Sequence, residues 1–118
     1  MRESTVVFVA SAINDAVILK KTTVEIEEGE TVYDILVQIA RQESITLNVN
    51  GNSVTGGVYV RSISSLGEFD NGDLSGWVYL VNGERASVGC DNYKLSPNDE
   101  ICWFYSLNLG EDAAGKEG

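Results

Sequence analysis

Apolar and polar positions near the start of the chain follow the two-residue period of half-buried strands. The segment from Ser4 to Ala10 is rich in β-branched and aromatic residues, and the segment from Val17 to Glu27 ends in apolar residues alternating with glutamates. The turn signal Asn14-Asp15 lies between the two segments. We therefore predict an N-terminal β-hairpin that has one buried face and one face in solvent.

After Gly29 the spacing changes to that of an amphipathic helix. Apolar residues recur at intervals of three and four positions: Val32, Ile35, Leu36, Ile39 and Ala40. Thr31 stands before this run and Asp34 follows three residues later, which is a capping box with Asp in place of the usual Glu. The pattern predicts one helix at about residues 32–43, with its apolar stripe across the inner face of the hairpin.

The rest of the chain predicts short strands separated by turns. The expected strands are Val58–Ile63, Trp77–Val81, Glu84–Val88 and Glu100–Leu107. Residues 64–76 are polar and predict a loop. This order of elements favours an α+β, β-grasp-like fold with an N-terminal hairpin, one helix and a mixed sheet whose final strand is parallel to the first.

Three turn signals connect these strands. Asn82-Gly83 is typical of a type I′ hairpin turn, and Asn50-Gly51 predicts a minor hairpin between residues 47 and 54. Pro97 fits the second position of a type I turn over residues 96–99. We expect one domain at residues 5–109, between a linker stub at residues 1–4 and a disordered tail at residues 110–118.

Alternation also divides the faces of the aromatic strands. Trp77 and Tyr79 share one face of their strand, and Val78 and Leu80 share the other. The aliphatic face suits a helix-covered core, which would direct the aromatic face towards a second small layer or a ligand groove.

The last strand carries a second aromatic face, formed by Trp103 and Tyr105. If the two aromatic faces adjoin, they form a stacking surface for a flat or sugar-like ligand, with the hydroxyls of Tyr59 and Tyr105 and the loop at 64–76 providing orientation. The alternative is that Trp77 and Trp103 simply fill a core.

Composition narrows the function classes. The chain of 118 residues has 18 acidic and 8 basic residues and a formal net charge of −10, which argues against nucleic acid and against an anionic membrane surface. There is no apolar run of about 18 residues and no signal-peptide pattern, so no membrane insertion is expected. Histidine is absent, which removes the usual general base and the histidine-dependent nucleophile arrangements. We predict that the protein is not an enzyme and has no catalytic residues.

The cysteines and acidic residues suggest no cofactor or metal. Loop residues 68–73 offer oxygen ligands but lack the spacing of a calcium-binding loop, so no metal site is predicted. A turn centred on Pro97-Asn98 would place Tyr93, and not Cys90, opposite Cys102. This register favours two buried thiols over a disulfide, although a bulge in the intervening segment would bring the two cysteines into reach.

Several blocks of the chain, in order, resemble the transcobalamin C-terminal-like domain. The blocks are Gly29–Leu36, Val58–Ile63, Gly76–Gly83, Tyr93–Leu95 and Asp99–Tyr105. This family is a domain of unknown function in many exported proteins of Gram-positive bacteria, and it is grouped with the β-grasp domains that bind soluble ligands. It is similar to the smaller, cobalamin-capping domain of transcobalamin and intrinsic factor.

The resemblance implies a non-catalytic, secreted or cell-surface module that belongs to a multidomain chain and binds a small soluble ligand or a surface partner. The resemblance implies cobalamin only distantly, and the aromatic strand faces suit a glycan as the other ligand class. The alternative is a structural or adhesive spacer in a larger surface protein, which the polar termini and the absence of the carriers' helical domain favour. Trp77 is carried over as a ligand contact, but Gly76 stands where the carriers have a second aromatic residue. The expected ligand-binding residues are Trp77, Tyr79, Trp103, Tyr59 and Tyr105.

Overall fold

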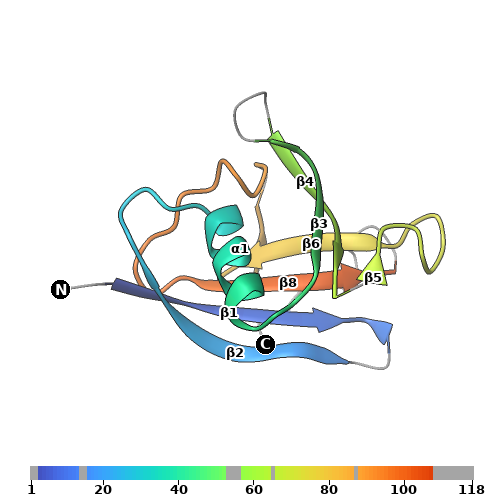
Figure 1. The fold of residues 1–118 in the computed structure, drawn as a ribbon, viewed down its shortest axis with the longest axis horizontal. Helices are drawn as coiled ribbons and strands as arrows, with labels where there is room; N and C mark the ends of the chain where they lie inside the picture. Colours follow the sequence, from blue (N-terminus) through green and yellow to red (C-terminus); the bar gives the residue numbers. More distant parts are fainter. Residues whose placement is uncertain (1–2, 14–15, 53–56, 65, 87, 108–118) are drawn as a thin grey trace.

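The computed structural model describes residues 3–13, 16–52, 57–64, 66–86 and 88–107, which form two sheets and one helix (Figure 1). The larger sheet has the order β2-β1-β8-β6-β7. Its strands are β1 (Glu3–Ser11), β2 (Val17–Ile26), β6 (Gly76–Val81), β7 (Glu84–Arg85) and β8 (Glu100–Ser106). The smaller sheet has the order β3-β4-β5, with β3 (Leu47–Asn52), β4 (Gly57–Ile63) and β5 (Leu66–Gly67). None of the helical structure in these ranges has the length and apolarity needed to cross a membrane.

The N-terminal hairpin and the parallel return of the last strand are both present. β1 pairs antiparallel with β2, from Glu3 opposite Ile26 to Ala10 opposite Val17. β8 lies between β1, to which it is parallel, and β6, to which it is antiparallel. As the central strand, β8 is buried on both faces from Ile101 to Ser106. The predicted α+β fold with a mixed sheet is therefore confirmed.

Helix α1 (Val32–Gln42) begins where the capping box predicted. The Thr31 hydroxyl accepts a hydrogen bond from the Asp34 backbone N–H at 3.2 Å, and the Asp34 carboxylate accepts one from the Thr31 N–H at 3.0 Å. The buried residues of the helix are the five predicted ones, and all of them except Ala40 share one core with Val7 and Val9 of β1. The helix thus covers the inner face of the hairpin as expected.

The prediction of which strand face meets this core is wrong. Trp77 and Tyr79 of β6 pack with the cluster that contains α1, whereas Val78 and Leu80 join a separate cluster with Phe104 on the opposite face of the sheet. Both faces of the sheet are apolar here, so the two-residue period separates the faces but does not say which of them the helix covers. The smaller sheet packs on the same face as α1 (Figure 1), and its residues Val60 and Ile63 share the core cluster that contains Trp77 and Trp103.

The turns confirm one prediction and correct two. Asn82 and Gly83 have φ values of 54° and 84°, as a type I′ turn requires. Asn98 has a φ of 69°, so the turn after Pro97 is type II and not type I; asparagine tolerates this conformation better than most residues. The predicted Asn50-Gly51 turn is wrong, because both residues continue β3 and pair with β4.

Some strand and loop boundaries differ from the predicted ones, and other predicted features lie outside the described residues. β1 already includes Glu3 and Ser4, which were assigned to the linker stub, and β7 ends at Arg85 rather than at Val88. The loop at 64–76 contains the short strand β5. The Asn14-Asp15 turn, position 54 and the tail at 110–118 lie outside the described residues.

Cys90 and Cys102 are both buried and are not joined in a disulfide, as predicted. They belong to different core clusters, Cys90 on the helix-covered face and Cys102 on the opposite face. The reason given from register was wrong, however. β8 pairs with β1 and β6, and the segment before Pro97 turns away to pair through Lys94 with Thr31.

Candidate functional site

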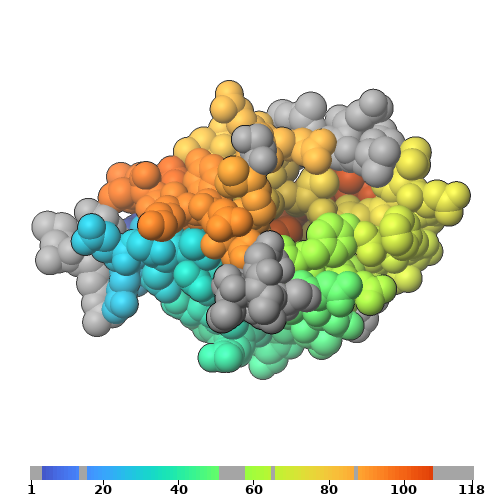
Figure 2. All heavy atoms as spheres, turned by 90° about the horizontal axis from the view of Figure 1, so that it is seen from above, coloured from blue at the N-terminus to red at the C-terminus, as the bar shows by residue number. Residues whose placement is uncertain are grey.

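A groove lies between β4 and the loop after β5 on one side and β6 and β7 of the larger sheet on the other. It has an inner chamber of about 180 Å³ and an adjoining outer chamber of about 340 Å³. Residues that line the inner chamber include Val58, Val60, Trp77, Tyr79, Cys90 and Trp103. Residues that line the outer chamber include Tyr59, Glu68, Phe69, Leu74, Gly76 and Trp77. Figure 2 shows the hollow between the lime residues of β4 and the gold residues of β6, with the red of β8 at its floor.

Trp77 lines both chambers, as do Tyr59, Val78 and Arg85. Its indole Nε1–H donates a hydrogen bond to the Leu66 carbonyl at 2.8 Å, and its ring meets Tyr105 edge-on with centroids 5.4 Å apart. Tyr105 is completely buried, and its hydroxyl donates to the Gly67 carbonyl at 2.7 Å and accepts from the Asn71 amide at 3.2 Å. These contacts tie β5 and its loop to the larger sheet and so fix the width of the groove.

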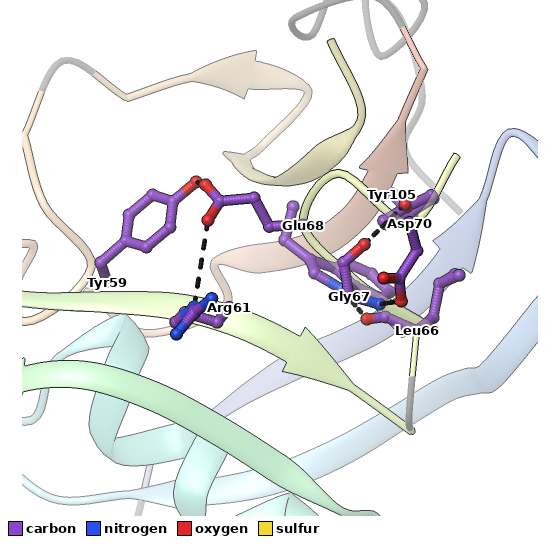
Figure 3. Close-up of polar contacts among 8 residues, drawn as sticks. Tyr59, Arg61, Leu66, Gly67, Glu68, Asp70 and Tyr105 are labelled. Atoms are coloured by element: carbon purple, nitrogen blue, oxygen red, sulfur yellow. Dashed lines mark hydrogen bonds and ion pairs between the residues drawn. The ribbon is translucent and has the colours of Figure 1, made fainter. Parts of the chain in front are cut away.

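A polar cluster sits at the outer rim of the groove (Figure 3). The Tyr59 hydroxyl donates a hydrogen bond to the Glu68 carboxylate, whose other oxygen lies 4.0 Å from Nε of Arg61. Partial burial, and then the hydrogen bond to Glu68, raise the pKa of Tyr59 to about 12. The phenol therefore stays protonated at neutral pH and holds Glu68 across the outer chamber.

Apart from Arg85, the residues that line the inner chamber are neutral. The Tyr79 hydroxyl donates to the Val88 carbonyl, and the Tyr79 ring lies 5.3 Å from Trp103 between centroids. Burial raises the pKa of Tyr79 to about 12. Burial, followed by the nearby Asp91 charge, raises the pKa of the Cys90 thiol to about 11. Cys90 is therefore a protonated thiol at neutral pH and is not prepared as a nucleophile.

Apolar side chains are exposed around the outer chamber. Phe69 is 61% exposed, Leu74 is 49% exposed and Tyr59 is 47% exposed. Phe69 has a positive φ of 66°, an uncommon conformation for an aromatic residue. Exposed apolar groups beside a concave surface are typical of binding sites.

The groups that line the groove are mainly aromatic rings, aliphatic side chains and protonated hydroxyl and thiol groups. Where the structure describes the chain, no group of three or more acidic, cysteine or histidine side chains could hold a metal ion. The titratable groups with raised pKa values in the groove are two phenols and one thiol, all protonated at neutral pH. An aromatic groove of this kind can stack on a ring and exclude water from it.

The structure brings four of the five predicted site residues to the groove: Trp77, Tyr79, Trp103 and Tyr59. Tyr105 lies beneath it, with its hydroxyl engaged by Gly67 and Asn71, and is not among the lining residues. The roles of all five as ligand contacts stay predictions.

The sequence analysis did not single out Phe69, Leu74 or Cys90 as groove residues. Phe69 did carry a signal, since it is a lone aromatic residue in an otherwise polar loop segment. Cys90 had no such sequence signal, because its segment is positioned by pairing with the start of α1, which no local sequence pattern predicts.

Comparison with known proteins gives a family and a fold. The model of the family described as "Domain of unknown function (DUF4430)" matches residues 29–106. No curated protein matches the sequence. Together with the fold likeness described next, the family match confirms the resemblance to the transcobalamin C-terminal-like domain.

Two solved structures are similar in fold. Haptocorrin, solved in complex with Cbi, is 21% identical with a TM-score of 0.72; the match covers 92% of this chain and 26% of haptocorrin. A protein of Ruminococcus gnavus ATCC 29149, named as a candidate metal-binding protein, is 15% identical with a TM-score of 0.56, and the match covers 88% of this chain and 96% of that one. This chain therefore spans about a quarter of the length of haptocorrin.

Proposed function

This chain belongs to the DUF4430 family, whose function is not known, and we propose that it is a non-catalytic module that binds a small soluble ligand in the groove between its two sheets. The observation that carries the proposal is the aromatic lining of a preformed groove by Tyr59, Trp77, Tyr79 and Trp103. Rings held by buried contacts present a rigid surface at low conformational cost, which favours a flat or sugar-like ligand.

The fold likeness to haptocorrin suggests which ligands to try first. That protein was solved with Cbi, so a cobalamin-like ligand is one class, and a glycan is the other class that suits aromatic stacking. Because this chain corresponds to only 26% of haptocorrin, the module would supply one wall of a larger site or bind a smaller ligand. We place it in a secreted or cell-surface multidomain protein, in keeping with the resemblance.

The chemistry of the groove supports a binding role without turnover. The chain has no histidine, and the Cys90 thiol has a pKa raised to about 11. Glu68, the carboxylate at the rim, is engaged by the Tyr59 hydroxyl and lies near Arg61. No pair of carboxylates poised for acid–base catalysis lines either chamber.

Titration of the domain with cobinamide, cobalamin and a panel of glycans tests the proposal, with tryptophan fluorescence and calorimetry as readouts. Binding should quench or shift tryptophan emission. Replacing Tyr59 by alanine should weaken affinity about two- to tenfold, because one stacking ring is lost. Val17→Ala is the matched control, since Val17 is a similarly exposed apolar residue on β2, which lines neither chamber.

Absence of any response at millimolar concentrations of every panel member would count against the proposal. The spacer role in a larger surface protein would then be the better account. Circular dichroism of each variant separates a lost contact from a lost fold.

A further inference from the structure

Gly76, the first residue of β6, lines the outer chamber of the groove. It pairs with Ser106 of β8, and its φ lies outside the positive range that favours glycine. A Cβ built on Gly76 would lie 3.9 Å from the Tyr59 hydroxyl oxygen and 4.0 Å from Cγ of Glu68, which are ordinary van der Waals distances. Alanine would therefore fit at this position, and neither the backbone conformation nor the described neighbours require a glycine.

Other glycines of the chain have a reason in the fold. Gly29 and Gly72 have φ values of 88° and 114°, which residues with a side chain rarely adopt. A Cβ on Gly67 would lie 3.0 Å from the Asp70 carboxylate, which accepts a hydrogen bond from the Gly67 N–H at 2.8 Å. A glycine inside a strand weakens the strand, and it often marks a place where a ligand approaches the backbone closely. Gly76 has this second property, since it is a strand residue that lines a chamber.

The outer chamber combines exposed apolar side chains with a hydrogen-bond acceptor. Phe69 and Leu74 are the exposed apolar groups, and Glu68 is the acceptor. One oxygen of the Glu68 carboxylate accepts from the Tyr59 hydroxyl, and the other lies 4.0 Å from Nε of Arg61, beyond hydrogen-bond length (Figure 3). An ionised carboxylate can accept about four hydrogen bonds, so Glu68 has capacity for donors from a ligand.

The charges and the size of the chamber narrow the ligand class. Arg85, which carries only donors, lines the chamber together with the acceptor Glu68. A hydroxyl group both donates and accepts, so a neutral ligand with several hydroxyls matches this pair. The chamber of about 340 Å³ is near the lower end of the range for ligand pockets, about 300–1,000 Å³, and so it suits a compact ring.

We infer that the outer chamber binds a neutral sugar ring and that Gly76 determines this specificity, because the missing side chain lets the ring lie against the β6 backbone. The inference rests on the proposed function and names the ligand class for this chamber. A sugar ring has an apolar C–H face for an exposed aromatic ring such as Phe69, and hydroxyls that donate to Glu68. A side chain at position 76 would occupy the space of the ring.

Substitution of Gly76 by alanine separates a role in binding from a role in the fold. Alanine fits without a close contact and loses less conformational freedom on folding, so Gly76→Ala should raise the folding equilibrium constant about two- to fivefold, seen as a higher urea midpoint. Gly67→Ala is the matched control and should not show this gain, because the Asp70 carboxylate would have to shift. A lower urea midpoint for Gly76→Ala would show that the fold needs this glycine and would overturn its assignment to the ligand.

The binding probes are the methyl pyranosides of glucose, galactose and mannose, titrated into ¹⁵N-labelled protein. At least one of them should shift the Gly76 amide resonance. That probe should bind Gly76→Ala about tenfold more weakly, since a methyl group takes up part of its space, and Gly76→Val more weakly still. Glu68→Gln keeps the size of the side chain and removes its charge, and should weaken binding about three- to tenfold. Val17→Ala should leave the affinity unchanged, because Val17 lines neither chamber.

No shift of the Gly76 amide with any of the three pyranosides at high millimolar concentration would overturn the sugar assignment. Unchanged affinity in both Gly76→Ala and Glu68→Gln would do the same, because the ring would then lie elsewhere. Titration with cobinamide keeps this result apart from the proposed function. If cobinamide binds and no pyranoside does, the groove still binds a ligand and only the sugar assignment is lost; if nothing binds, the proposed function fails as well.

Discussion

The α1 side and the groove side of the molecule lie on the same face of the larger sheet but are packed differently. Over β1, the helix inserts a narrow stripe whose members Ile35 and Ile39 are fully buried. Over β6, the smaller sheet and its loop leave two chambers, with Phe69 and Leu74 about half exposed or more. The aliphatic side chains of α1 pack closely against the larger sheet, whereas the aromatic rings between the two sheets leave unfilled volume. We conclude that the α1 side supplies stability, and the proposed function assigns ligand binding to the groove side.

Truncation of one apolar side chain on each side should give the largest contrast. Ile39→Ala should lower the free energy of unfolding by about 3 kcal/mol, because it removes buried methyl groups and leaves a cavity beneath α1. Leu74→Ala, at a half-exposed position, should cost less than about 0.5 kcal/mol. Urea unfolding followed by circular dichroism measures both.

Equal costs for these two variants would break the comparison. They would mean that the outer chamber closes over Leu74 in solution and that its walls belong to the core.

Substitution of each tryptophan by phenylalanine should give the next largest difference. Both substitutions remove similar volume, but Trp77→Phe breaks a hydrogen bond and leaves the Leu66 carbonyl without its donor, whereas the Trp103 indole N–H has no partner among the described residues. Trp77→Phe should therefore be about 1 kcal/mol more destabilising than Trp103→Phe. The same urea unfolding experiment gives the difference directly, and a reversed order would contradict the hydrogen-bond assignments.

The α1 side was also the part that the sequence predicted best. The capping box at Thr31 and Asp34 and the helical spacing of five apolar residues are local signals, and the structure has both. The parallel return of β8 followed from the order of elements. These features depend on neighbours in sequence or on general rules of chain crossing, so they can be predicted from one chain.

The groove side was harder because long-range packing forms it. The pattern of β6 separated Trp77 from Val78 correctly but could not say which face the helix and the smaller sheet would cover. Asn50-Gly51 has a strong hairpin signal, yet pairing with β4 keeps both residues extended in β3. The contact of Trp77 with Leu66 and the lone N–H of Trp103 depend on tertiary positions that no local pattern encodes.

Alkaline pH should weaken the fold through the groove side. Tyr79 has a folded pKa of about 12 against an ordinary value of 10.0, and Cys90 has one of about 11 against 9.0. A raised pKa means that the folded state favours the protonated form, so this stability is fully present below about pH 9 and is lost as pH rises through 11 and 12. The urea midpoint should fall over that range.

In Tyr79→Phe, the urea midpoint should fall less steeply as the pH approaches 12. Ultraviolet absorbance should show one fewer tyrosine that ionises in this pH range. Thiol labelling of Cys90 at pH 8 should be slow in the folded protein and fast in urea. Rapid labelling of Cys90 in the folded state would show that the inner chamber opens.

The smallest effect on stability is expected from Tyr59→Phe, and it is the most informative about the rim. The variant keeps the ring and removes the hydroxyl that donates to Glu68. Because Tyr59 is 47% exposed, stability should change by less than about 0.5 kcal/mol, as for other surface polar contacts. Tyr33→Phe is a control from the α1 side, since Tyr33 packs against the helix-covered core and lines neither chamber. If Tyr59→Phe lowers the free energy of unfolding by more than about 1.5 kcal/mol, the Tyr59–Glu68 contact mainly stabilises the fold. That result would count against the proposal that this part of the groove is a ligand-binding surface. A near-zero cost combined with weaker binding of a corrinoid or glycan would instead show that this contact orients the rim for recognition.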